Sequence, residues 1–532
     1  MSTITTSVPN PRRWQILAVL CVALFAIVMD NTIVNVALPT LARELRAGTS
    51  GLQWIVDAYT LVFAGLLLAA GGVGDRFGRK LTLIAGLVAF GAFSVAGALA
   101  SSSGQLIAAR ALMGVGAASI FPTTLAIAVN VFTDARERAA AIGIWTAVTG
   151  VGVALGPISG GWLLEHFSWG SVFLVNVPIV IAAVAGAVWL VPNSRDPRAP
   201  RLDLAGLGLS IAGITLLVWS LIEAPRHGWV SFATVGGVAG AIAILGVFAL
   251  WERRVSQPLL DVRLFRNRRF SAASLAVTLG FFSLFGFIFL VTQYFQLVKG
   301  YSALQAGVRT VPFALAMAIA AVSAPQIVKR TGTKVVVAAG LTLMAAGFAV
   351  AATTDAANSY GIIVTAMVLM GSGLGVAVTP ATESILGALP RDKAGVGSAV
   401  NDTTREVGGT LGVAVLGSIM ATLYGGKIVD ASRALGLPAA LRQTAGDSLA
   451  AALQIAERVG GAAGAGIARI AQDAFVNAFQ VGSVVTGAVA LLGAVIALLF
   501  LPARSADEER SALVIEGATD GRSEVEPVLE RA

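Results

Sequence analysis

A carboxylate stands in the middle of the first long apolar stretch of the chain, at Asp30 in the run Met29 to Pro39. A charged carboxylate inside a membrane-crossing segment is costly, and binding one proton removes its charge. The residue and its place therefore indicate a group that can take up and release a proton. The alternative is a structural carboxylate that is bonded to Asn35 or to a facing helix.

Two further ionisable side chains complete the predicted proton-coupling set. Asp57 lies three residues after Trp54, near the start of the second apolar stretch, where it is either an ordinary interfacial residue or part of a vestibule. Arg110 lies within the fourth stretch. Because a buried arginine keeps its proton, it needs a carboxylate, carbonyl or water partner, and Asp30 is the natural candidate.

A charged cluster comes late in the chain, at Asp402, Arg405 and Glu406. On a helix Asp402 and Glu406 share a face, and Arg405 can reach Asp402. A self-neutralised pair near the membrane surface is one interpretation, and a titrating group is the other. The sequence leaves both open.

Composition shows what must position these residues. The 532 residues are 56% hydrophobic and only 12% charged, whereas a soluble domain carries about 25% charged residues. Windows of about 20 apolar residues predict fourteen membrane-spanning helices. They begin near Trp14, Gln53, Leu81, Gln105, Ala139, Ser171, Asp203, Val230, Ser271, Gln305, Lys334, Tyr360, Val396 and Val481.

Charge placement predicts the orientation. If the N-terminus is cytoplasmic, 25 of the 37 Lys and Arg residues fall in inner segments and nine in outer ones. Five of those nine lie in a single long loop, where the positive-inside rule applies least. We therefore expect both termini to be cytoplasmic and the chain to cross the plasma membrane, as in a bacterial inner membrane.

The expected organisation is all-α. It comprises a cytoplasmic segment 1–13, a six-helix bundle 14–191, two additional helices 203–250, a second six-helix bundle 271–502 with an outer loop 425–480, and a disordered cytoplasmic tail 503–532. The outer loop is rich in alanine and carries too many charges for a span, so short surface helices are expected there.

Two glycine-rich motifs stand out. The first is a charged turn between the second and third spans, formed by Gly71, Asp75, Arg76, Gly78, Arg79 and Lys80, which must lie at a membrane surface. A degraded copy, Lys329 to Lys334, indicates two homologous halves. The second motif is in the fifth span, formed by Gly152, Gly156, Pro157, Gly160 and Gly161. Its proline and bare glycine face predict a bendable helix that a partner can approach closely, for packing and gating; ordinary small-residue packing is the alternative.

These motifs resemble those of the major facilitator superfamily. The turn is similar to its Gly-x-x-x-Asp-Arg-x-Gly-Arg-Lys loop, with Val73 in place of the usual Leu. The fifth-span motif is similar to the signature of its antiporters, and the Asp30 to Pro39 segment resembles the fourteen-span drug:proton antiporters of the QacA/EmrB type. In the second half, Glu406 replaces a common glutamine. The resemblance implies the major facilitator fold, proton-driven export of amphipathic drugs or toxic molecules, and a conformational latch at Asp75.

Other classes of function find little support. The only histidines are His166 and His227, no phosphate-binding loop is present, and the single cysteine is Cys21, so we expect neither an enzyme nor a metal site or other cofactor beyond protons. The net charge of +8 follows membrane topology, so no nucleic acid is expected. The expected partners are the bilayer and a small amphipathic substrate, for a carrier acting as a monomer. An exporter of one endogenous metabolite, or a proton symporter for uptake, remains an alternative.

Overall fold

The structure is a computed structural model that describes residues 11–195, 202–356, 360–389, 394–434 and 438–502. Across these ranges every regular element is a helix, and 14 helical segments are long and apolar enough to cross a membrane. The expected all-α, fourteen-span fold is therefore confirmed. Residues 1–10 of the N-terminal segment and the 503–532 tail lie outside the described residues.

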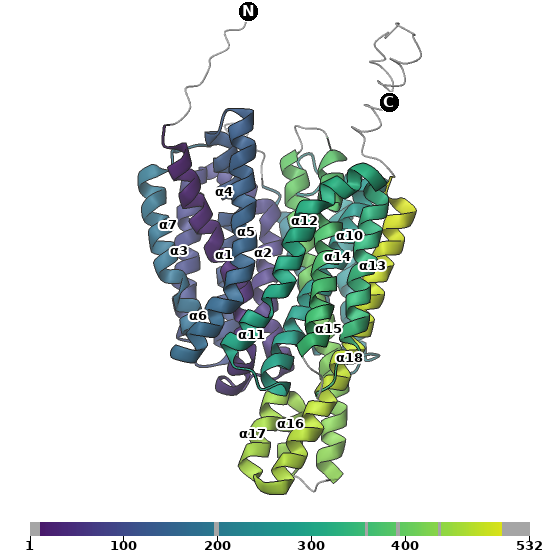
Figure 1. The fold of residues 1–532 in the computed structure, drawn as a ribbon. Helices are drawn as coiled ribbons and strands as arrows, with labels where there is room; N and C mark the ends of the chain where they lie inside the picture. The colour runs from purple at the N-terminus through teal and green to yellow at the C-terminus, as the bar shows by residue number, and fades with distance from the viewer. Residues whose placement is uncertain (1–10, 196–201, 357–359, 390–393, 435–437, 503–532) are drawn as a thin grey trace, which may run out of the picture.

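The first six spans pack together on one side of the molecule (Figure 1). Here the last span is broken after one turn, so that seven helices make six crossings. The helices are α1 (Arg13–Glu44), α2 (Thr49–Phe77), α3 (Arg79–Ala98), α4 (Ser103–Val131), α5 (Ala135–His166), α6 (Ser171–Leu174) and α7 (Asn176–Leu190).

Six further spans form the other half of the molecule (Figure 1). Its elements are η1 (Val262–Arg266), α10 (Arg268–Gln293), the π-helix η2 (Tyr294–Val298), α11 (Ala303–Arg309), α12 (Val311–Thr331), α13 (Thr333–Ala351), α14 (Tyr360–Gly387), α15 (Ala394–Ala434) and α18 (Gly461–Phe500).

The two halves repeat the same backbone devices. Gly78 (φ 108°) ends α2 and Gly332 (φ 82°) ends α12, both in a region that favours glycine. Eight residues later, Gly86 and Gly340 allow the next two helices to touch. A Cβ on Gly86 would lie 3.0 Å from a backbone oxygen of α4, and one on Gly340 would lie 2.6 Å from a backbone oxygen of α14. The charged turn and its degraded copy therefore occupy equivalent places.

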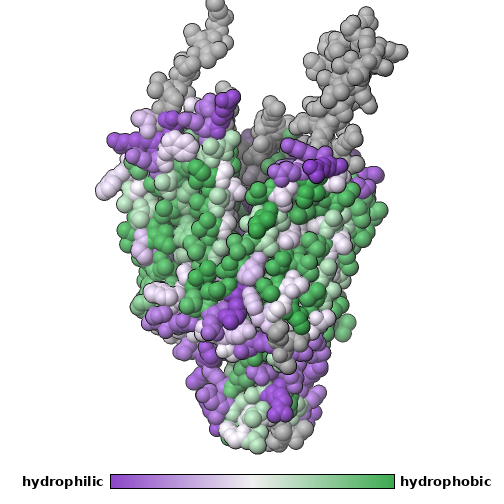
Figure 2. Space-filling model, viewed as in Figure 1, coloured by the Kyte–Doolittle hydropathy of each residue, from purple (hydrophilic) through white to green (hydrophobic). Residues whose placement is uncertain are grey.

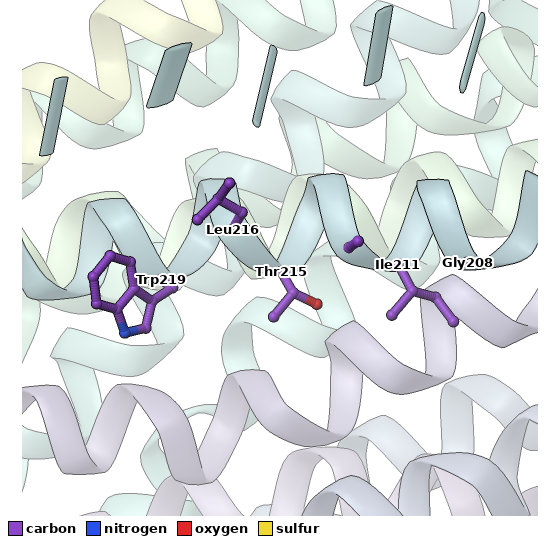
Figure 3. A pocket seen from close by; sticks show the side chains of 6 residues that line it. Gly208, Ile211, Thr215, Leu216 and Trp219 are labelled. Atoms are coloured by element: carbon purple, nitrogen blue, oxygen red, sulfur yellow. The ribbon is translucent and has the colours of Figure 1, made fainter. Parts of the chain in front are cut away.

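An accessory pair of spans, α8 (Leu204–His227) and α9 (Phe232–Glu252), separates the halves in sequence. Helix α8 contacts both α2 and α15, whereas α9 packs against α8. An apolar recess of about 480 Å³ runs along α8, and Figure 3 shows Ile211, Thr215 and Trp219 on the side of the helix that lines it. The recess contains no ionisable side chain, so it is separate from the charged residues described below.

Beyond the bilayer-length core, the chain forms a helical projection, here called the cap (Figure 1). It consists of the ends of α15 and α18 with the short helices α16 (Ala439–Asp447) and α17 (Leu449–Val459). The segment 425–480 thus contains the expected short helices, but it is not a loop, because α15 runs on to Ala434 and α18 begins at Gly461. Its alanine-rich sequence favours helix over loop.

The halves meet mainly on the side of the cap. Cross-half hydrogen bonds join Gln296 Nε2 to the Val36 carbonyl (2.8 Å), and Thr410 Oγ1 to Thr60 Oγ1 (3.0 Å). On the opposite side, where the described chain begins and ends and which we call the terminal face, Figure 2 shows a notch between the halves. Polar residues mark both ends of the molecule around an apolar band, as a membrane protein requires (Figure 2).

Candidate functional site

Asp30 and Arg110 form an ion pair in the interior of the first half. Asp30 lies midway along α1 and Arg110 lies on α4, and the pair joins Asp30 Oδ2 to Arg110 Nη1. Both side chains are fully buried, at 0% exposure. The partner that the sequence suggested for Arg110 is thus the one that the structure shows.

Helix α2 supplies the other contacts of Arg110. Arg110 Nε donates a hydrogen bond to the Ile55 carbonyl (3.1 Å), and the Arg110 guanidinium lies over the ring of Tyr59, 4.2 Å from the centroid. A carbonyl and an aromatic face both stabilise a cation that is excluded from water. The Nη2 atom has no hydrogen-bond partner, so the guanidinium keeps one unused donor group.

Asn176 is a further member of the site that the sequence motifs do not single out. It is fully buried at the start of α7, and its Nδ2 donates to Asp30 Oδ1 at 2.8 Å and to Ser94 Oγ at 3.3 Å. Each Asp30 oxygen thus has one donor. One feature of the sequence does indicate it: Asn176 is the single polar residue in the apolar segment Phe173 to Val177. A buried amide needs a hydrogen-bond partner, so its presence there predicts a polar contact.

The pair can act chemically as a proton-dependent contact. A guanidinium does not lose its proton, so only Asp30 can change charge. Protonation of Asp30 would leave Arg110 as an uncompensated buried cation and so favour a different arrangement of α1, α2 and α4. A change in the charge of Asp30 would therefore act on the packing of these three helices.

Asp57 lies apart from this pair. It is 0% exposed, and neither carboxylate oxygen has a hydrogen-bond partner. On α2 it lies between Gln53 and Thr60, which both bond to α15. The structure thus buries Asp57 beside the seam between the halves, where the sequence suggested an interfacial or vestibule position.

The second-half cluster is only partly paired. Arg405 Nη1 lies 3.8 Å from Asp402 Oδ1, and the guanidinium lies 4.8 Å from the ring centroid of Phe281. Glu406 Oε2 is buried without a hydrogen-bond partner. The Asp402 and Arg405 contact matches the expected i,i+3 pairing, whereas Glu406 stays outside it.

The glycines of the fifth-span motif face two partners. A Cβ on Gly152 would lie 2.9 Å from Val28, one on Gly156 would overlap Thr32, and one on Gly160 would lie 2.5 Å from Ile33, so these glycines form the contact of α5 with α1. Gly161 faces α11 of the other half, where a Cβ would lie 2.5 Å from Leu304 Cα. The motif therefore packs α5 closely against both halves.

The charged turn closes locally. Asp75 Oδ1 accepts hydrogen bonds from Arg79 Nε (2.8 Å) and Nη2 (2.7 Å). The two residues are four positions apart, on either side of the break between α2 and α3. Lys80 Nζ donates to the Val188 carbonyl at the end of α7 (2.7 Å). In this conformation Asp75 is paired within its own half.

Comparison with known proteins finds similarity to membrane transporters along most of the chain. Residues 20–413 match the family model described as Major Facilitator Superfamily. The chain is 38% identical over 420 residues to the multidrug efflux pump LfrA of Mycolicibacterium smegmatis, which covers 79% of this chain and 83% of that protein. It is 32% identical over 521 residues to the tetracenomycin C resistance and export protein of Streptomyces glaucescens, covering 96% of each.

A solved structure shares the fold. It is a bacterial homologue of the human lysosomal transporter Spinster, in an inward-facing and unoccupied conformation, with a TM-score of 0.64. The two chains are 17% identical, and the match covers 92% of this chain and 98% of that one.

Breaking the buried ion pair on one side should destabilise the protein strongly. Arg110→Met leaves Asp30 buried without its counter-charge, a loss of about 3–5 kcal/mol. Adding Asp30→Asn removes the stranded charge and should restore most of that stability. Arg433→Met, which breaks an exposed contact to Asp430 at 3.7 Å, is the control and should change stability by less than about 1 kcal/mol. Thermal unfolding of purified protein measures all three; equal melting of the single and double variants would contradict the pairing.

Filling the α1–α5 contact should also destabilise the fold. Gly156→Leu forces a side chain into the space of Thr32 and should cost about 1–3 kcal/mol or more. Gly150→Leu on the same helix meets nothing within 4 Å of its Cβ and is the matched control. The melting temperature in detergent should fall for the first variant and stay unchanged for the second. A normal melting temperature for Gly156→Leu would show that α1 and α5 tolerate separation.

Proposed function

The chain belongs to the major facilitator superfamily, and we propose that it is a proton-coupled antiporter that exports amphipathic drugs or toxic small molecules by alternating access. The relatives named above are efflux and export proteins, and a puromycin resistance protein of Streptomyces alboniger is 36% identical over 415 residues. These likenesses support a carrier that moves compounds outward.

The observation that carries the proton coupling is the buried pair of Asp30 and Arg110. Both side chains are at 0% exposure, and their contact crosses between two spans of the first half. Charge placed this deep in a membrane protein is a functional signal, because a purely structural role could be filled by apolar residues at lower cost. Asp30 is the member of the pair that a proton can neutralise.

The proposed cycle alternates two states of Asp30. In the state described here its carboxylate is held by Arg110 and Asn176. A proton that reaches Asp30 from outside would release Arg110, and return to this pairing on the inner side would expel the proton. Substrate would leave as the proton enters. A proton gradient could thereby drive the two arrangements of α1, α2 and α4 in one direction.

Asp57 and the Asp402/Glu406 pair are the reserve candidates. Asp57 has the stronger position, because both of its oxygens are buried without partners beside the seam between the halves. A charged carboxylate there is costly, so binding a proton is again the simplest relief. Glu406 follows, since one of its oxygens is buried and unpaired.

A second candidate is an exporter dedicated to one compound. It is favoured by the match to the tetracenomycin C export protein, which extends over 96% of both chains. The two proposals differ in breadth of substrate, so a panel of cationic, neutral and anionic amphipathic compounds separates them. Response to a single member of the panel would favour the dedicated exporter, and response to several would favour the drug exporter.

Asp30→Asn should abolish uphill transport. The amide fixes a neutral side chain, so the residue can no longer exchange a proton with the two sides, whereas substrate binding does not require that exchange. In everted vesicles energised to a proton gradient, substrate addition should discharge the gradient with the wild type and fail to do so with Asp30→Asn. A pH-sensitive dye reports the gradient, and ethidium is the first substrate probe.

Asp430→Asn is the matched control, because Asp430 is an exposed carboxylate of the cap with a side-chain exposure of 77%. It should behave as the wild type. If vesicles with Asp30→Asn still accumulate ethidium against its concentration gradient when a proton gradient is applied, Asp30 is not the proton carrier. We then expect Asp57→Asn to abolish proton coupling instead.

The terminal face is proposed to be cytoplasmic, in the inner membrane of a bacterium, because short loops on that side hold most of the Lys and Arg residues. With Cys21→Ser as background, a membrane-impermeant maleimide should label Arg458→Cys, on the cap, in intact cells. It should label Arg266→Cys only after the cells are opened. Both positions are exposed, so the reagent can reach each of them from its own side of the membrane. Labelling of Arg266→Cys in intact cells would contradict the proposed orientation.

A further inference from the structure

Helices α2, α8 and α15 meet at a junction near the cap. An apolar cluster joins Leu61 of α2, Val218 and Ile222 of α8, and Ala414 of α15. Beside this cluster, Ser418 of α15 is hydrogen-bonded to both of the other helices. The junction therefore links the first half, the accessory pair and the second half at one place.

The bond between Ser418 and α8 satisfies a carbonyl that the sequence leaves free. Pro225 lies inside α8 and has no N–H group, so the Leu221 carbonyl, four residues earlier, lacks its helical partner. Ser418 Oγ donates to this carbonyl at 2.7 Å. Moving α8 away from α15 would leave this carbonyl without its hydrogen-bond partner, which costs free energy for a buried backbone group.

The bonds between Gln53 and α15 are of a different kind. Gln53 is 0% exposed, and its Nε2 donates to the carbonyls of Ala414 (2.8 Å) and Val413 (3.2 Å) and to Ser418 Oγ (3.3 Å). Both carbonyls lie within the continuous helix α15 and face N–H groups of that same helix, at Gly417 and Ser418. Releasing Gln53 therefore leaves the backbone of α15 paired.

Other contacts tie α8 to the second half at this end. Trp229, in the turn after α8, donates from Nε1 to Thr422 Oγ1 of α15 at 3.0 Å. Arg226 of α8 also acts on Asp447 in the cap: burial raises the pKa of the Asp447 carboxyl, and the charge of Arg226 opposes that rise.

Nearer the terminal face, α8 meets the first half through apolar contacts such as Ile211 with Gly65, where a Cβ would lie 2.8 Å away. Apolar contacts in a bilayer can be exchanged for lipid.

From this asymmetry we infer that the accessory pair α8–α9 moves with the second half, and that the gate on the cap side opens between α2 and α15 by release of Gln53. The inference rests on the proposed alternating transport. It assigns Gln53 a gating role and makes Ser418 and Pro225 the attachment of the accessory pair.

Two cysteine pairs test the inference in full-length protein with Cys21→Ser. Gln53→Cys with Gly417→Cys bridges α2 to α15 as a disulfide. Trp229→Cys with Thr422→Cys removes the indole that spans the gap, so a short bismaleimide bridges the α8–α9 turn to α15. Oxidation of the first pair should remove about nine-tenths of ethidium export, because the gate can no longer open. Bridging the second pair should leave export nearly unchanged, because those parts move together. Reduction should restore the first pair.

Two outcomes would overturn the inference. Export that survives the first cross-link would place the gate elsewhere, and export lost equally with both cross-links would show that α8 moves relative to α15. The unmodified protein, assayed in the same vesicles, reports separately on proton-driven export. Its failure would remove the proposed function whatever the cross-links do.

A labelling measurement keeps the test independent of transport. Ala414→Cys, which is buried at 0% exposure, reports opening of the seam to a maleimide from the cap side. Labelling should rise several-fold with Gln53→Leu. It should stay at the basal level with Gln480→Leu, which removes a similar amide bond to the Thr354 carbonyl (2.8 Å) within the second half. Equal labelling with the two variants would contradict a gating role for Gln53.

Discussion

Arg110 cannot lose its proton, and it lies where water does not reach, so the first half is organised to neutralise it. Asp30 provides the charge, the Ile55 carbonyl accepts a hydrogen bond, and Tyr59 provides an aromatic face. These partners come from α1 and α2, and Asn176 of α7 holds the remaining oxygen of Asp30. Four helices thus owe part of their arrangement to one cation, and a change in the charge of Asp30 would affect all of them.

Close approach of helices makes this arrangement possible. Gly152, Gly156 and Gly160 let α5 lie directly against α1, the helix that carries Asp30. In the second half the equivalent contact between α10 and α15 follows the same scheme: a Cβ on Gly408 or Gly412 of α15 would lie 2.3 or 2.1 Å from a backbone oxygen of α10. The halves therefore share their backbone geometry but differ in chemistry, because among the described residues the fully buried ion pair lies in the first half.

The seam between the halves combines permanent and reversible contacts. Ser418 completes a carbonyl left free by Pro225, whereas Gln53 adds bonds to carbonyls within a continuous helix. Asp57 lies on the same stretch of α2 as Gln53, buried without a partner. A gate and an ionisable group therefore share one helix face, which gives the proposed transport cycle a physical connection between proton binding and opening of the cap side.

The sequence by itself determined the number of spans and the two-half repeat, and it singled out Asp30 and Arg110, which the structure pairs. The length of an apolar segment, a glycine in a turn and a charge within an apolar run are local properties. Local properties can be recognised from the sequence because they depend only on residues that are close together in the chain. It also predicted short helices in 425–480, but it missed that α15 and α18 extend into the cap, because charges in an alanine-rich segment exclude a span without excluding a helix.

Only the tertiary structure decided which groups meet. Asn176 is one amide in an apolar segment, and nothing in the sequence near it points to Asp30. Asp57 looked interfacial because it lies near Trp54, yet packing at the seam buries it completely. The sequence marks Gln53 only as the predicted start of the second span, whereas the structure buries it against α15. Partners far apart in the chain depend on how the helices pack, and that arrangement is set by many weak contacts at once rather than by any local pattern.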